Sequence, residues 1–156
     1  MQKQPTNTEP AAPGADKLNL AKLNCHHIVI FDGVCLFCHA AVNFIIKRDK
    51  KAVFLFCPMQ TQLATDLMQQ YKVKPASSDT IYLFKQGQCY TYSSAALEIS
   101  KSLSGLWFIL TILALLPKSW RDYGYKAFAK RRYQWFGKAE QCILPTTDTK
   151  SRFIGL

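Results

Sequence analysis

The segment that most limits the fold of this chain is residues 27–38, where the apolar run His-Ile-Val-Ile-Phe leads directly into Asp-Gly-Val-Cys-Leu-Phe-Cys. An apolar, β-branched run closed by Asp-Gly is typical of a buried strand that ends in a turn. Residues 35–51 then contain neither Pro nor Gly, and their apolar side chains recur at helical spacing. The sequence therefore predicts a strand, a tight turn, and a helix that starts at the first cysteine.

The segments that follow predict the remaining strands and helices of an α/β domain. A second apolar run at 53–57, ended by Pro58, implies a strand parallel to the first, joined to it by a right-handed crossover. A helix is expected at 60–71, a hairpin with strands at 80–84 and 89–92, and a helix from 93 or 94 to about 103. This β-α-β-α-β-β-α order is that of a thioredoxin-like domain, which is the fold class that we expect.

The chain is expected to form one domain with additions at both ends. Residues 1–24 are polar and contain several prolines, so they are predicted to be a flexible tail, and residues 25–104 are predicted to form the thioredoxin-like core. Residues 105–145 are predicted to be a helical extension packed on the core, and residues 146–156 a C-terminal tail. Within the extension, the almost wholly apolar segment 106–116 is expected to be buried against the sheet, and a helix is expected at 119–136.

Composition places the chain among ordinary globular proteins. It has 156 residues, 49% of them hydrophobic and 19% charged, and its six cysteines are too sparse for a disulfide scaffold. The first residues lack the apolar core of a signal peptide, and the longest apolar run is shorter than the roughly 20 residues that cross a bilayer. We therefore expect a cytoplasmic location, where a closely spaced cysteine pair is more often catalytic or metal-binding than structural.

Cys35 and Cys38 are the candidate catalytic residues. Residues three apart share one face of a helix, and the N-terminus of a helix favours an anion. We expect Cys35 to be the exposed, attacking thiolate and Cys38, one turn further in and more buried, to be the resolving thiol of a thiol–disulfide exchange. The alternatives are a structural pair and a zinc site.

A zinc site needs four ligands, and the chain has only one such closely spaced pair. The remaining candidate ligands lack diagnostic spacing, so neither a metal nor a cofactor is predicted. These candidates are Cys25, His26, His27, His39, Cys57, Cys89 and Cys142.

Asp32, which precedes the cysteines, has two interpretations. It could end the strand and support the turn or the helix cap. It could also act catalytically, by relaying the proton when Cys38 resolves a mixed disulfide. A phosphatase of the haloacid-dehalogenase type would need a nucleophilic Asp two residues earlier, and that position is Ile30, so phosphotransfer is excluded.

The segment 117–138 combines positive charge with aromatic side chains. Its seven basic residues and one acidic residue supply six of the ten net positive charges of the chain. The pattern fits an amphipathic helix that packs its aromatic side chains on the domain and leaves a cationic face in solvent. As an alternative function, it fits a binding module that docks on an anionic membrane surface or on nucleic acid through Lys130, Arg131 and Arg132. Of these partners we expect a weak membrane contact rather than nucleic acid.

Three parts of the sequence together resemble the DCC family of thiol–disulfide oxidoreductases. They are D-G-V-C-L-F-C after a strand, the strand entry Asp79-Thr80-Ile81, and the late motif Arg132-Tyr133-Gln-Trp135-Phe136-Gly137 with Cys142. The resemblance covers residues 27–145. It implies a thioredoxin-like fold and a redox role, and the Asp and two Cys that name the family match Asp32, Cys35 and Cys38.

The chain differs from thioredoxins proper at one position. Thioredoxins place a cis-proline immediately before the third strand, where it guides a peptide substrate towards the cysteine pair. The corresponding position here is near Asp79 or Thr80, and Pro75 lies upstream of it. The expected partner is therefore a disulfide-containing protein of a narrower kind, or a small-thiol substrate.

Overall fold

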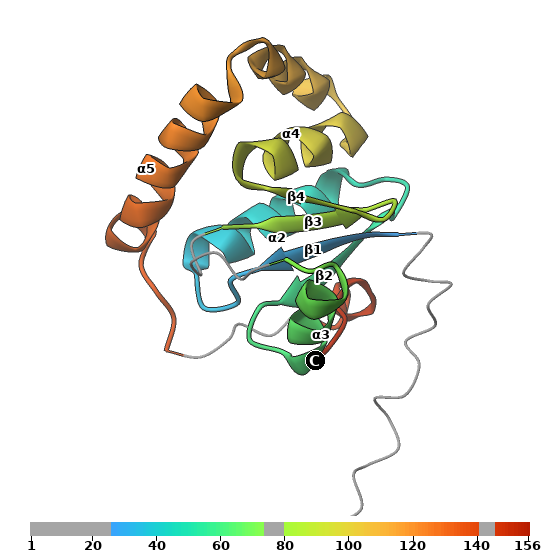
Figure 1. Cartoon of the computed structure of the whole chain (residues 1–156). Coiled ribbons are helices and arrows are strands. Elements are labelled where there is room, and N and C mark those ends of the chain that lie inside the picture. The colour runs from blue at the N-terminus through green and yellow to red at the C-terminus, as the bar shows by residue number, and fades with distance from the viewer. Residues whose placement is uncertain (1–25, 74–79, 141–145) are drawn as a thin grey trace, which may run out of the picture.

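The computed structural model describes residues 26–73, 80–140 and 146–156, and its centre is a four-stranded sheet (Figure 1). Strands β1 (His27–Phe31), β2 (Phe54–Pro58), β3 (Tyr82–Lys85) and β4 (Gln88–Thr91) lie in the order β2-β1-β3-β4. β1 pairs in parallel with β2 and antiparallel with β3, and β3 pairs antiparallel with β4. The predicted parallel pair and the predicted hairpin are therefore both present.

Helices cover both faces of the sheet. α2 (Leu36–Arg48) and α4 (Tyr92–Ser102) pack on one face, and α3 (Gln62–Gln70) packs on the other (Figure 1). Because successive side chains of a strand point to opposite faces, Val29 and Phe31 of β1 enter one core, and Ile28 and Ile30 enter the other. The result is the thioredoxin-like α/β fold that the sequence predicts.

α5 (Lys118–Phe136) crosses the outside of α2 and α4 (Figure 1). Aromatic side chains make its contact with α2, where the rings of Phe37 and Phe128 lie 4.9 Å apart. Near its start, Asp122 accepts hydrogen bonds from the amide and the hydroxyl of Ser93, at the beginning of α4. These contacts bring the C-terminal half of α5 to the N-terminus of α2, where the cysteine pair lies.

The apolar segment between α4 and α5 is not buried, so the expectation for it is wrong. It forms a 3₁₀ helix, η1 (Leu106–Leu115), in which none of the residues is buried. Trp107 reaches furthest inward, and its ring meets that of Phe44 edge-on at 4.7 Å. Because α2 and α4 already cover this face of the sheet, η1 packs on α4 and turns most of its side chains to solvent. None of the described helices is both long enough and apolar enough to span a membrane.

The last residues of the chain contribute to both cores. A short 3₁₀ helix, η2 (Lys150–Arg152), is followed by Phe153 and Ile154, which join the cores on opposite faces of the sheet. The Ile154 amide donates to the Phe56 carbonyl at 2.9 Å, which ties the segment to β2. The sequence predicts only a C-terminal tail at 146–156, and no pattern in it indicates these contacts with the two cores.

Candidate functional site

Cys35 is the N-cap residue of α2, where the motif places it. Its backbone is extended, with φ −86° and ψ 115°, and its sulfur accepts a hydrogen bond from the Cys38 amide at 3.3 Å. The turn before it is closed by the Cys35 amide, which donates to the Asp32 carbonyl at 3.3 Å. The unpaired N–H groups and the dipole at this end of a helix stabilise negative charge near the Cys35 sulfur.

Cys38 lies one turn further along α2, and both cysteines are free thiols. Burial strongly raises the pKa of Cys38, and the hydrogen bond with the Cys35 side chain raises it further, whereas the charge of Arg132 opposes the increase. At neutral pH Cys38 is therefore a protonated thiol. The two sulfurs thus differ in electrostatic environment, as an attacking and a resolving thiol must.

The exposure of the two cysteines is the reverse of the expected order. The side chain of Cys35 is fully buried, whereas that of Cys38 is half-buried. Residues that follow α5 lie against the motif, because Lys138 forms a β-bridge with Cys35 and the next amide donates to the Val34 carbonyl at 2.8 Å. We call residues 137–139 the cover segment. Cys35 and Lys138 are about a hundred positions apart in the sequence. The local pattern around the cysteine pair therefore could not predict that the cover segment buries Cys35.

Asp32, at the end of β1, is the centre of a buried polar network. One carboxylate oxygen accepts hydrogen bonds from the Val34 amide at 3.2 Å and from the Gln60 side chain at 2.9 Å. The other accepts from Arg132 at 3.2 Å and from the Tyr133 hydroxyl. Asp32 is 2% exposed and Arg132 is 3% exposed, so this ion pair is almost completely shielded from water. A buried charge is tolerated only when it is paired and hydrogen-bonded in this way.

The Asp32 side chain supports the turn before α2, as one of its two interpretations expects, because its carboxylate accepts a hydrogen bond from the Val34 amide. It also brings Asp32 close to the redox pair, because the Asp32 charge is one of the contributions that raise the pKa of Cys38, after burial and the bond to Cys35. The Asp32 carboxylate therefore supports the turn and lies within electrostatic reach of Cys38.

The prediction that Arg132 lies on a docking surface together with Lys130 and Arg131 is wrong for Arg132. Its side chain is buried against Asp32, whereas Lys130 and Arg131 are exposed. Consecutive residues of a helix point in different directions, so three in a row cannot share one face. Burial lowers the pKa of Arg132, but the Tyr133 hydroxyl and then both cysteine sulfurs raise it, so its guanidinium lies within electrostatic reach of the pair.

Gln60 and Tyr133 belong to the site but are not predicted as site residues from the sequence. Gln60 follows β2 and Asp32 follows β1, and neighbouring parallel strands end at the same edge of a sheet. The contact between Gln60 and Asp32 could therefore have been predicted from the two expected strands. Tyr133 stood in the late motif of the family resemblance, but residue spacing alone does not connect it to Asp32. Burial is the main cause that raises the pKa of Tyr133 to about 12, and the hydrogen bond to Asp32 is the second. The hydroxyl therefore stays protonated at neutral pH and donates its hydrogen bond to Asp32.

The other described cysteines lie away from the pair. Cys57 is buried at the end of β2, and Cys89 is half-buried on β4. Cys25 and Cys142 lie outside the described residues. Within the ranges 26–73, 80–140 and 146–156, His, Cys, Asp and Glu side chains do not gather in groups of three or more that could hold a metal ion.

The chain is similar to known proteins over most of its length. The chain is 36% identical over 129 residues to the uncharacterized protein YuxK of Bacillus subtilis (strain 168), covering 83% of this chain and 94% of that protein. It is 29% identical over 119 residues to the chloroplastic DCC family protein At1g52590 of Arabidopsis thaliana, covering 75% of this chain and 69% of that protein. No solved structure matches the chain. Residues 29–138 match the family description, and the chain belongs to the DCC1-like thiol-disulfide oxidoreductase family.

Proposed function

We propose that the chain catalyses thiol–disulfide exchange, with Cys35 attacking a substrate disulfide and Cys38 resolving the mixed disulfide. The observation that carries this proposal is the pair of free thiols at the start of α2, where the Cys38 amide donates to the Cys35 sulfur. Cys35 is the N-cap residue of α2 with the Arg132 guanidinium nearby, while the raised pKa of Cys38 keeps that thiol protonated. The substrate is the disulfide of a protein partner or of a small-thiol compound.

Attack by Cys35 requires the cover segment to move, because the Cys35 side chain is fully buried beside Lys138. Few contacts hold this segment in place at the motif: the β-bridge to Cys35 and the hydrogen bond to Val34. Opening of such a short segment costs much less free energy than global unfolding. Exchange is therefore compatible with a fold that otherwise stays closed.

Trapping of the mixed disulfide tests the order of attack. The Cys38→Ser variant, treated with a small disulfide, should accumulate an adduct on Cys35, because the resolving thiol is gone. The Cys35→Ser variant should form no adduct. Cys57→Ser provides a matched control, since it removes a buried cysteine outside the pair. An adduct on Cys38 in the Cys35→Ser variant, located by peptide mass mapping, would reverse the assignment.

The same protein sample tests the metal-bound alternative. Wild-type chain should form a reversible disulfide between Cys35 and Cys38 under mild oxidant, seen by alkylation and mass analysis, and should contain zinc far below one equivalent. One zinc per chain together with a pair that resists oxidation would overturn the redox proposal.

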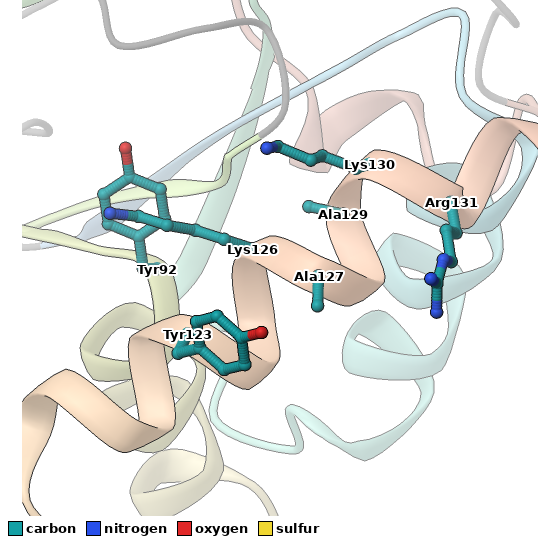
Figure 2. Close-up of a pocket in the computed structure, with 7 residues that line it drawn as sticks. All are labelled: Tyr92, Tyr123, Lys126, Ala127, Ala129, Lys130 and Arg131. Atoms are coloured by element: carbon teal, nitrogen blue, oxygen red, sulfur yellow. The ribbon is translucent and has the colours of Figure 1, made fainter.

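A second candidate function, docking on an anionic membrane surface, is favoured by the exposed apolar side chains of η1. Basic residues follow them at once, with Lys118 and Arg121 at the start of α5. Figure 2 shows Lys126 and Lys130 extending from α5 to the same side, and the Lys126 ammonium lies 4.7 Å from the centre of the Tyr92 ring. Apolar side chains flanked by cations match the surface of an anionic bilayer. The exposed apolar residues are Leu106, Phe108, Ile109, Leu110, Ile112, Leu113 and Leu115.

Vesicle binding tests this second candidate. The full chain should sediment with vesicles of phosphatidylcholine and phosphatidylglycerol, and much less with phosphatidylcholine alone. The double variant Ile112→Glu/Leu115→Glu should lose binding, because it places charge in the inserted face. Leu156→Glu, at an exposed leucine far along the chain, is the control that should still bind. Equal binding of the double variant and wild type would exclude η1 as the docking element.

A further inference from the structure

A partly open cavity of about 440 Å³ lies beside the redox pair, between the sheet and the helices α2, α4, η1 and α5. Its walls are mainly aliphatic and aromatic and include Phe31, Trp107 and Phe128. Cys38 lines this cavity, whereas Cys35 does not. The cavity therefore reaches the redox pair at Cys38.

The polar groups in the cavity wall already have partners within the protein. Asp32 and Arg132 form an ion pair, the Tyr125 hydroxyl accepts from the Ile81 amide, and the Ser100 hydroxyl donates to a carbonyl of its own helix. The paired charges of the wall cancel each other. A molecule inside the cavity would therefore be held by apolar contacts, which favours a neutral, apolar ligand.

The size of the cavity fits a small molecule. Ligand sites commonly enclose about 300–1,000 Å³, and a dry apolar cavity of about 150 Å³ is enough for benzene. Two of the lining residues, Ala96 of α4 and Leu110 of η1, are exposed, so the mouth of the cavity lies between these two elements. A ligand can therefore enter from solvent without disruption of the sheet.

We propose that this cavity binds the apolar groups of a neutral, low-molecular-weight disulfide and holds its S–S bond beside Cys38, where Cys35 attacks it once the cover segment has moved. This inference rests on the proposed function and adds the class of substrate. In the overall exchange the substrate S–S bond breaks and an S–S bond forms between Cys35 and Cys38. The two hydrogens of the cysteine thiols pass to the two halves of the substrate, which leave as thiols, so two electrons move from the protein to the substrate.

A matched pair of disulfides tests the substrate class. Dipropyl disulfide and bis(2-hydroxyethyl) disulfide have the same length and no charge, and differ in a terminal methyl or hydroxyl group. Reduced protein should be oxidised at least roughly tenfold faster by dipropyl disulfide, after correction for the rates of both with free dithiothreitol, because burial of an unpaired hydroxyl is costly. Equal corrected rates would overturn the inference and leave the redox function intact.

Filling the cavity provides a second test that does not depend on redox chemistry. The neutral fluorescent probe N-phenyl-1-naphthylamine should bind wild-type protein, and Ala41→Phe and Ala96→Phe should weaken binding about tenfold or more. Ala96 is exposed at the mouth, so its variant keeps the fold even where Ala41→Phe does not. Ala40→Phe, at an exposed position of α2 outside the cavity, is the control.

The two tests separate failure of this inference from failure of the proposed function. Probe binding that Ala96→Phe abolishes, together with a lost preference for dipropyl disulfide in that variant, supports the cavity as the substrate site. If the pair is oxidised but the probe does not bind, the cavity inference falls alone. If the probe binds but neither disulfide oxidises the pair, the redox proposal falls, and with it the disulfide as ligand.

Discussion

The Asp32 carboxylate is almost completely shielded from water, and hydrogen bonds from four residues stabilise it there. These residues are Val34, Gln60, Arg132 and Tyr133. The ion pair with Arg132 is the one that balances its charge. Removal of one member of a buried ion pair leaves the other unpaired, which typically costs about 3–5 kcal/mol. We expect Asp32→Asn to lower the free energy of unfolding in urea by about this amount. Adding Arg132→Met should recover part of the loss, because the remaining buried charge is removed.

Two measurements separate the roles of Asp32. Asp66→Asn, at an exposed carboxylate of α3, is the control and should change stability by less than about 0.5 kcal/mol. In the folded fraction of Asp32→Asn, the rate at which Cys38 resolves a mixed disulfide should fall and change its pH dependence if Asp32 relays the proton. An unchanged rate with reduced stability would leave Asp32 with its structural role alone.

Cys57 should make stability depend on pH in the alkaline range. Burial raises the pKa of its thiol to about 11, and the hydrogen bond with Thr61 only partly opposes this. Between about pH 9 and 11 the unfolded chain loses this proton and the folded chain keeps it, so stability falls as pH rises. The protonated Cys57 thiol contributes its full stabilisation below about pH 9. By pH 11 the free energy of unfolding is lower by about 2 kcal/mol.

Denaturation of wild type and Cys57→Ala at pH 8 and pH 10.5 measures this contribution. The variant should be less stable at pH 8, because a buried sulfur is removed, yet it should lose less stability on going to pH 10.5. Subtraction of the two curves cancels the other groups that titrate in this range. Parallel curves would mean that Cys57 is protonated equally in the folded and unfolded states.

At the scale of elements, the end of α5 controls access to Cys35. Gly137 caps this helix with φ +85°, and an added Cβ would meet a side-chain carbon of Leu36 at 3.3 Å. Non-glycine residues rarely adopt such a φ, so Gly137→Ala should displace the cover segment. We expect alkylation of Cys35 in the native protein to become several-fold faster, measured by mass mapping against time.

Gly124→Ala is the matched control for this variant. Gly124 lies within α5, and a Cβ there meets nothing within 4 Å, so the substitution should stabilise the helix and leave the alkylation rate of Cys35 unchanged. Should Gly137→Ala also leave the rate unchanged, then movement of the cover segment would not limit access to Cys35.

The elements themselves were largely predictable, and contacts distant in sequence were not. The strand, turn and helix around the cysteines follow from local patterns, and α2 does begin immediately after Cys35. The burial of Arg132 against Asp32 could not be inferred from spacing, because the two residues are a hundred positions apart. The prediction from apolar composition was wrong for η1, which has the composition of a core segment but is not buried. An apolar segment can be buried on a sheet only where other helices do not already cover that face, and here α2 and α4 cover it.

At the scale of the whole molecule, η1 and α5 form one side and α3 lies on the opposite side of the sheet (Figure 1). The mouth of the cavity opens between α4 and η1, on the side that also carries the exposed apolar residues. A membrane contact through η1 would therefore bring the cavity mouth close to a region in which apolar disulfides concentrate. The two proposals are independent, yet they assign compatible roles to the same side of the molecule.

Salt dependence tests whether the positive charge of this side matters. Binding of the full chain to anionic vesicles should weaken steeply as salt rises, because each Lys or Arg near such a surface contributes about 1 kcal/mol and salt screens that attraction. The variant Lys130→Glu/Arg131→Glu should bind at least tenfold more weakly, whereas its disulfide exchange should be unchanged. Lys50→Glu/Lys51→Glu carries the same change in net charge at the end of α2 and should bind as wild type does. If both double variants lose binding equally, the attraction comes from the net charge of +10 and not from α5.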